Sequence, residues 1–500
     1  MNEPIGGGKV DHPLTDPSRV EGVVAAMWGD DSIAVAKDAF QWLESISAAA
    51  EFSLPARYAV IDRIDVSIKR HGQRLLEQYL ALKPQSMFQE RQLWKAATDI
   101  WKALGDAYGV CIAQAGADAA AAAAFRATLP ALLARAMRAQ TLQIKWILMR
   151  YGYVDDGYWH AVAGLYRHAE SGGFLDAVVD IYGGAHGRGS VRQEFLRALM
   201  LGVSSTGGLS PIQQNIAERA IAHFSGHFES GMLPGEGRNF LFDLNGGHSP
   251  ARALGVPVAG VQLFYFGAGG ALDGAQKIID AILESGEQAL LDIDLGPGEN
   301  IDRMADTLTH LAFNWEKELP LRDSERREVN STLQVTQGFD GVLALGQRVV
   351  QETWMVDNAS AEGYGLIVPA RRGEWLQVGV LIGILPEGEP AAWGAGVVRR
   401  VESDGQGQRR VGIQVLSRRV VPATMTLRGA DAGHLPQTVV FLDAEPSQSG
   451  YWLALLRPGS LVLRDAFEAT RVADGMTFIV TPSGLVESGP DFDRVRFKTA

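Results

Sequence analysis

Apolar residues recur at helical spacing over most of the first 230 residues. In the first such stretch Ile33, Ala36, Phe40 and Leu43 lie three or four residues apart, the spacing of one face of an α-helix. Because the pattern continues with glycine-rich stops between its segments, it predicts an all-α domain over residues 31–230. Its helices are expected over residues 33–46, 56–83, 90–113, 117–152, 155–171, 190–203 and 211–228.

Two segments of different character flank this helical domain. Residues 1–30 are rich in Gly, Pro and acidic residues, so we expect a loose leader. Over residues 231–318 short apolar runs alternate with amphipathic stretches, which predicts a small α/β segment. The glycine run 267–270 lies where a dinucleotide fingerprint would occur, but position 272 is Leu, so a plain loop is the preferred interpretation. The expected elements are strands at 239–244 and 258–266 and helices at 272–285 and 299–317.

From about residue 330 to the end the hydrophobic period changes to two. Val378, Val380 and Ile382 alternate with small or outward positions, as in half-buried antiparallel strands. Short runs of this kind recur with turn residues between them, which predicts closed barrels or sandwiches. We expect two β units, at residues 319–424 and 435–500, and hence an α+β chain with a helical N-terminal half. Further strands are expected near 331–336, 352–357, 364–368, 394–401, 411–415, 437–442, 451–456, 476–480 and 493–497.

Composition narrows the class of protein. With 46% apolar and 21% charged residues, the 500-residue chain has the make-up of an ordinary globular protein of several domains. A net charge of -12 argues against a general binder of nucleic-acid polymers. The single cysteine, Cys111, excludes an internal disulfide and a multi-cysteine metal site. No basic and apolar secretion signal and no apolar run of bilayer length occur, so we expect a cytoplasmic protein without membrane insertion.

Candidates for catalysis and metal binding are weak in the helical half. The glycine-rich stretch Gly183–Gly189 precedes a predicted helix and could cradle a phosphate, but an interhelical loop is the preferred interpretation. His160 and His168 are too far apart along one helix for a shared metal ion. His223 and His227 have the i, i+4 spacing but lack the glutamate of a metalloprotease motif. We therefore expect no metal, no cofactor and no enzyme, with an unrecognised hydrolase as a remote alternative.

One polar turn in the first β unit has a pattern typical of ligand binding. Asn358, Ser360 and Gly363 form the pattern Asn-x-Ser-x-x-Gly, and Arg322 and Arg326 form Arg-x-x-x-Arg just before the first predicted strand. An asparagine side chain and a serine hydroxyl can reach a guanine edge, while glycine allows a tight turn. The planar guanidinium of arginine bonds phosphate and the O6/N7 edge of guanine bidentately. The two motifs together indicate a ligand-binding site.

The order and spacing of these motifs resemble those of the PilZ domain family. The resemblance implies a small six-stranded barrel that binds cyclic di-GMP, with Arg322 and Arg326 clamping guanine and phosphate. Arg327 competes with Arg326 for the second role. On this basis we expect a non-enzymatic cyclic di-GMP receptor or effector, in which the ligand fixes the arginine arm and so alters domain arrangement and the contact of the helical half with a protein partner. The alternative is an adaptor or scaffold whose degenerate barrel binds no nucleotide.

Overall fold

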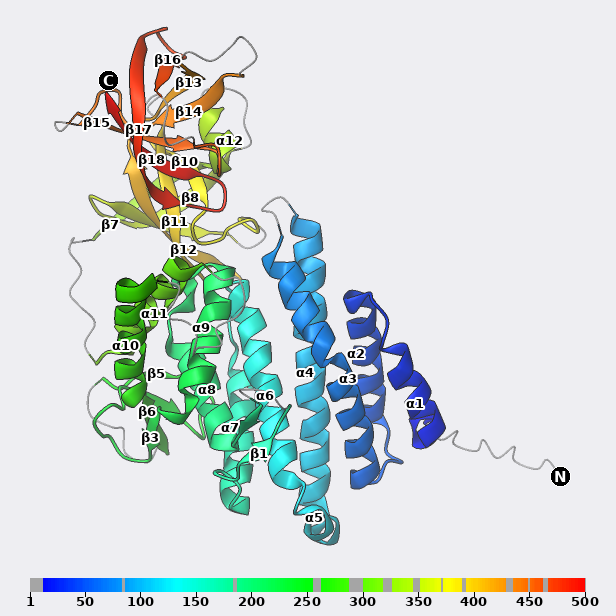
Figure 1. Ribbon diagram of the computed structural model, residues 1–500. Coiled ribbons are helices and arrows are strands. Elements are labelled where there is room, and N and C mark those ends of the chain that lie inside the picture. The colour runs from blue at the N-terminus through cyan, green and yellow to red at the C-terminus, as the bar shows by residue number, and fades with distance from the viewer. Residues whose placement is uncertain are drawn as a thin grey trace. The chain divides into compact units, whose positions relative to one another are not determined.

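The computed structural model divides the chain into two compact units (Figure 1). The helical unit comprises Met1–Arg150, Val154–Thr206 and Pro211–Leu319, and the barrel unit comprises Tyr151–Tyr153, Gly207–Ser210 and Pro320–Ala500. The structure describes residues 12–82, 86–182, 187–254, 262–286, 300–317, 326–344, 351–369, 372–388, 393–428, 435–447, 450–461 and 466–499.

The helical unit is built around its longest helix, α4, which packs against α2, α3 and α6 (Figure 1). Of the helices that the structure describes, none combines the length and the apolar character that crossing a bilayer requires. The unit contains the helices α1 (Pro17–Ala26), α2 (Ser32–Ala48), α3 (Leu54–Leu80), α4 (Met87–Ala117), α5 (Ala119–Phe125), α6 (Leu129–Met149), α7 (Asp156–Gly172), α8 (Val191–Val203) and α9 (Pro211–His223), the hairpin β1 (Val179–Asp180) and β2 (Arg188–Gly189), and the short 3-10 helices Pro13–Thr15, Thr206–Gly208 and Phe224–Gly226.

Local signals explain two departures from the expected helices. The leader contains α1, because the Asp16 side chain caps it by accepting from the Ser18 amide and Pro17 occupies its first turn. The single helix expected over 117–152 is divided into α5 and α6. Pro130 lies in the first turn of α6, where its missing N–H would be unpaired anyway, and so marks a new helix start. Residues 1–11 lie outside the described part of the chain.

The α/β segment completes the helical unit. Its antiparallel sheet has the strand order β3-β6-β4-β5. Two amphipathic helices, α10 and α11, pack against each other beside it. Part of the expected strand at 258–266 falls within 255–261, outside the described residues. The elements are β3 (Glu229–Gly231), β4 (Phe240–Asp243), β5 (Ala251–Arg252), β6 (Leu263–Gly267), α10 (Gly270–Ser285) and α11 (Ile301–Trp315).

The barrel unit holds two closed antiparallel barrels of six strands each. The first closes in the order β10-β11-β12-β9-β8-β7 and the second in the order β13-β14-β15-β18-β17-β16. The strands are β7 (Arg327–Gln337), β8 (Glu352–Ala359), β9 (Gly363–Val368), β10 (Leu381–Pro386), β11 (Gly394–Ser403), β12 (Arg409–Ser417), β13 (Val421–Leu427), β14 (Gln437–Phe441), β15 (Tyr451–Leu456), β16 (Phe467–Arg471), β17 (Thr477–Ser488) and β18 (Asp493–Thr499), with the short helix α12 (Gly338–Leu343) after β7.

The core of the first barrel follows from the period of two. Trp354, Val356, Leu366 and Val411 are buried and belong to one apolar cluster, while the residues between them point outward. Tyr151 joins the same cluster, and its hydroxyl accepts a hydrogen bond from the Val378 amide at 3.0 Å. This tyrosine therefore belongs to the barrel although it precedes α7 in the sequence.

The α+β class, with a helical N-terminal half and closed β-barrels in the C-terminal half, is confirmed. One strand differs from the expected division of the β region. β13 begins at Val421 and pairs with β14 and β16 of the second barrel, whereas the first β unit was expected to extend to residue 424. The expected boundary at Gly429–His434 lies outside the described residues.

Candidate functional site

The polar turn singled out in the sequence connects β8 to β9 in the first barrel. The Ser360 amide donates to the Gly363 carbonyl at 2.9 Å, which closes the turn. The Ser360 hydroxyl accepts from the Glu362 amide at 3.4 Å, so this side chain already supports the turn. Ser360 is thus held in one place by backbone groups of its own loop.

Close approach of neighbouring strands explains two glycines of this hairpin. A Cβ at Gly363 would collide with the carbonyl oxygen of Ile413 on β12. A Cβ at Gly365 would lie 2.7 Å from both Oδ1 and Nδ2 of Asn358, tighter than such contacts normally are. Glycine at position 365 therefore lets the Asn358 side chain lie across β9.

The arginine arm meets the turn through a hydrogen bond from Arg326 to Asn358. Arg326, directly before β7, donates from Nη1 to Oδ1 of Asn358 at 3.1 Å. Asn358 in turn donates from Nδ2 to Oδ2 of Asp357 at 2.8 Å. The amide thus lies between a cation on its acceptor side and a carboxylate on its donor side, which fixes its orientation.

The other arginines of the arm have different positions. Arg327 is the first residue of β7 and lies opposite Ala359, so the arginine that contacts Asn358 is Arg326. Arg322 falls within 318–325, outside the described residues. The structure therefore brings Arg326 and Asn358 together and places Ser360 and Gly363 in the adjoining turn.

This arrangement offers donors and acceptors suited to a nucleotide. Arg326 is exposed, and Asn358 is partly exposed. A guanidinium carries five N–H donors in one plane, and an amide offers both a donor and an acceptor, which together match a guanine edge or a phosphate. The Asn-x-Ser-x-x-Gly motif does not include Asp357 or Gly365, which orient the Asn358 amide. The sequence signal for this part of the site is that Gly363 and Gly365 lie two residues apart in one strand.

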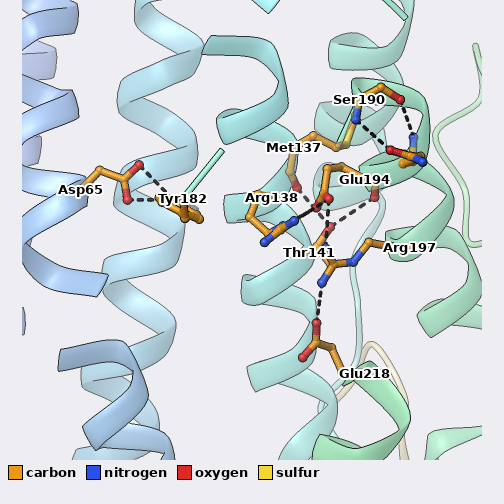
Figure 2. Close-up of polar contacts among 10 residues, drawn as sticks. Asp65, Met137, Arg138, Thr141, Tyr182, Ser190, Glu194, Arg197 and Glu218 are labelled. Carbon is orange, nitrogen blue, oxygen red and sulfur yellow. Dashed lines mark hydrogen bonds and ion pairs between the residues drawn. The ribbon is translucent and has the colours of Figure 1, made fainter. Parts of the chain in front are cut away.

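A second cluster of charged side chains is buried inside the helical unit (Figure 2). Arg138 on α6 donates from Nη2 to Glu194 on α8 at 2.7 Å, and Arg197 donates to the same carboxylate at 2.9 Å. Arg197 also donates to Glu218 on α9 at 2.9 Å. Lys145 on α6 donates to the other oxygen of Glu218 at 2.9 Å. The cluster ties three helices together by internally paired charges.

The protonation of this cluster follows from its charges. Burial alone would raise the pKa of Glu218, but the positive charges of Lys145 and Arg197 more than offset this effect and hold its pKa far below the usual range. Glu194 likewise has a lowered pKa, because Arg138 and Arg197 outweigh its burial. Both carboxylates are therefore ionised at neutral pH. Such pairing indicates a structural role for the cluster.

Asp65 on α3 forms a separate buried site beside this cluster (Figure 2). Its carboxylate accepts from the Tyr108 hydroxyl at 2.6 Å and from the Tyr182 hydroxyl at 2.8 and 2.9 Å. Burial raises the pKa of Asp65 to about 6, although the two tyrosine hydrogen bonds and the charge of Arg135 act in the opposite direction. Asp65 is therefore a buried acid of the helical unit whose pKa is raised toward neutral pH.

The remaining candidates offer less chemistry. Across the described ranges no group of three or more His, Cys, Asp or Glu residues could hold a metal ion. His160 bonds the Asp156 carbonyl at 2.8 Å, as a surface helix residue does. Gly183–His186 of the proposed phosphate loop lies outside the described residues. A groove of about 620 Å³ between α1 and α2 is lined mainly by apolar side chains, including Val23, Met27 and Trp42.

Comparison with known proteins bears on the helical part of the chain. No curated protein matches the chain. A family model does match, and it covers α2 to α9, including the buried charge cluster, while the two barrels lie beyond its limits. The family is named for a cyclic di-GMP receptor, the ligand class that the Asn358 and Arg326 motifs in the other half of the chain had indicated. Residues 20–232 thus match the family described as the cyclic-di-GMP receptor FimW, N-terminal domain.

Proposed function

We propose that this chain is a non-enzymatic cyclic di-GMP receptor that binds its ligand on the outer surface of the first barrel, at Arg326, Asn358 and the turn formed by Ser360 and Gly363. The observation that carries the proposal is the hydrogen bond from Arg326 to Asn358, which joins two motifs separated by 32 positions in the sequence. The receptor description of the family matched by residues 20–232 supports the same ligand.

The contacts of these residues suggest how binding proceeds. Arg326 transfers from the Asn358 amide to a guanine O6/N7 edge or a phosphate, where a bidentate charge-assisted bond replaces one bond to a neutral amide. Asn358, still held by Asp357, then presents its acceptor oxygen to the base. In this proposal the barrel is of PilZ type, and Arg322 supplies a second guanidinium from the same arm.

The place of the arm in the sequence suggests an output. Arg326 lies between the end of α11 at Trp315 and the start of β7 at Arg327, where the chain passes from the helical unit to the barrel unit. Anchoring Arg326 on a ligand fixes the barrel end of this connection. The arrangement of the two units then changes as in a hinge motion. We assign partner binding to the helical unit, and the single cysteine agrees with a cytoplasmic location.

One observation favours the adaptor alternative. The polar groups of the turn already have partners: Asn358 bonds Arg326 and Asp357, and the Ser360 hydroxyl bonds within its loop. A barrel kept only for protein contact would show the same bonds. In that case the helical unit would act without a nucleotide signal.

Isothermal titration of cyclic di-GMP into the full chain separates the two functions. Arg326→Ala should lose the ~1–3 kcal/mol of binding free energy of a bidentate guanine contact. The Kd should therefore rise about five- to 150-fold. Arg428→Ala, at an exposed arginine after β13 in the second barrel, is the matched control and should bind like the unmodified chain. Equal affinity of both variants would remove Arg326 from the site, and the absence of binding by the unmodified chain would favour the adaptor.

A further inference from the structure

A row of outward positions crosses five strands of the first barrel and continues from Asn358 to an arginine. The residues of this row are paired across neighbouring strands. The pairs are Glu328 with Asn358, Asn358 with Gly365, Gly365 with Gly412, and Gly412 with Arg400. The row therefore runs over β7, β8, β9, β12 and β11.

The neighbouring row fixes the direction of these side chains. Val356, Leu366, Val411 and Val401 are opposite one another on the same strands, and all four are buried in the barrel core. Because successive residues of a strand point to opposite faces, Gly365, Gly412 and Arg400 face outward. Asn358 follows an irregularity in β8 after Val356, and its amide lies on the same outer side, over the Cβ position of Gly365. The positions from Asn358 to Arg400 thus form part of the barrel's outer surface.

Gly412, in the middle of this row, has almost no neighbouring side chain above it. Only one neighbouring atom would lie within 4 Å of a Cβ at Gly412, the Cβ of Arg400 at 3.4 Å, so the space over this glycine is open. Gly365 beside it is covered by the Asn358 side chain. Three strand spacings, roughly 14 Å, separate Asn358 from Arg400. A glycine floor between an amide and a guanidinium suits a flat aromatic ring.

The charge at the far end of the row is available for a ligand. Arg400 donates from Nε to Glu402 at 2.8 Å, and 54% of its side chain is exposed. An exposed ion pair of this kind contributes little stability, so exchanging Glu402 for a ligand costs little. Arg410 lies opposite Glu402 in register, so a second arginine stands beside the Arg400–Glu402 pair on the next strand.

We propose that the floor over Gly412 and the guanidinium of Arg400 hold the second guanine of bound cyclic di-GMP, while Arg326 and Asn358 hold the first. This inference rests on the proposed function and extends its site from β8 across β9 and β12 to β11. Arg400 leaves Glu402 for the O6/N7 edge of the base, and Arg410 neutralises an adjoining phosphate. The open backbone at Gly412 lets the ring approach closely.

The test is a set of titrations with cyclic di-GMP and with GMP as a single-guanine probe. Gly412→Thr fills the floor with a side chain that favours strands, and Arg400→Ala removes the cation. Each should weaken cyclic di-GMP by about tenfold or more while leaving weak GMP binding unchanged, because GMP uses the Arg326 half. Gly484→Thr is the matched control, a strand glycine in β17 of the second barrel with open space at its Cβ, and it should change neither.

The outcomes separate this inference from the proposed function. If the unmodified chain binds no cyclic di-GMP, the proposed function fails. If it binds, and Arg326→Ala weakens binding while Gly412→Thr and Arg400→Ala do not, only the second subsite is refuted. Equal thermal melting of Gly412→Thr and Gly484→Thr would ensure that a lost affinity reflects the floor and not misfolding.

Discussion

Replacing Asp65 with asparagine should change how the stability of the helical unit depends on pH. The carboxyl is buried and accepts hydrogen bonds from Tyr108 and Tyr182, and burial raises its pKa from 3.8 to about 6. The folded state therefore holds the proton more tightly than the unfolded state. Stability due to this group falls as pH rises from about 3.8 to about 6 and stays low above that range. Asp65→Asn removes this loss and keeps an oxygen that can accept from the tyrosines.

The magnitude follows from the pKa difference between the two states. A rise from 3.8 to about 6 corresponds to ~3 kcal/mol in total, at 1.36 kcal/mol per pKa unit. Between pH 5 and pH 8 the free energy of unfolding of the unmodified chain should fall by about half of this amount, ~1.4 kcal/mol, relative to that of the variant. The absolute stability of Asp65→Asn includes other changes, but this difference between two pH values isolates the titration of Asp65.

Urea unfolding of the full chain, followed by far-UV circular dichroism at pH 5 and pH 8, measures this difference. The free energy of unfolding of Asp65→Asn, taken relative to that of the unmodified chain, should increase as the pH rises. The control is Asp106→Asn, which removes an exposed carboxylate on α4 paired with Lys102 and should show no such gain. If Asp65→Asn and the unmodified chain keep the same stability difference at both pH values, the reasoning from burial of Asp65 is refuted.

Three further predictions concern other sites. Glu218→Ala leaves the buried Arg197 without one of its carboxylate partners and should cost the helical unit about 3–5 kcal/mol in urea unfolding; a loss below ~1 kcal/mol would contradict a structural role. Gly365→Ala places a Cβ 2.7 Å from the Asn358 amide and should raise the Kd for cyclic di-GMP by about tenfold without lowering the melting temperature, which titration and thermal melting test. Burial raises the pKa of Cys111 to about 12, so its thiol should react with a disulfide reagent at pH 8 only after unfolding, and rapid reaction of the folded chain would argue against this burial.

Periodicity predicted the fold class because it reports which face of each element is buried. The change from a helical period to a period of two near residue 330 corresponds to the passage from helices to barrels. It could not predict that β13 at Val421–Leu427 pairs within the second barrel, because strand pairing depends on contacts distant in sequence. The α5–α6 division was missed since the alanine-rich run has high helix propensity on both sides of residue 126.

The candidate site was predictable only as far as motifs extend along the chain. Spacing identified Arg326 and Asn358, and the structure adds that they are in contact. Gly412 and Arg400 could not be linked to them from the sequence, since their alignment depends on the register of β9, β12 and β11 and on the irregularity in β11 between Val398 and Arg400. A lone glycine in a strand carries no such information until its neighbours are known.

The most direct test of the receptor function is a calorimetric titration of the full chain with cyclic di-GMP and, in parallel, with cyclic di-AMP. The two ligands share their phosphates and differ in the base edge, and only guanine presents the O6/N7 acceptor pair that Arg326 reads. A receptor of this kind should show saturable binding of cyclic di-GMP that is weakened in Arg326→Ala, with cyclic di-AMP at least about tenfold weaker. No heat with excess cyclic di-GMP, or equal binding of both ligands, would contradict it.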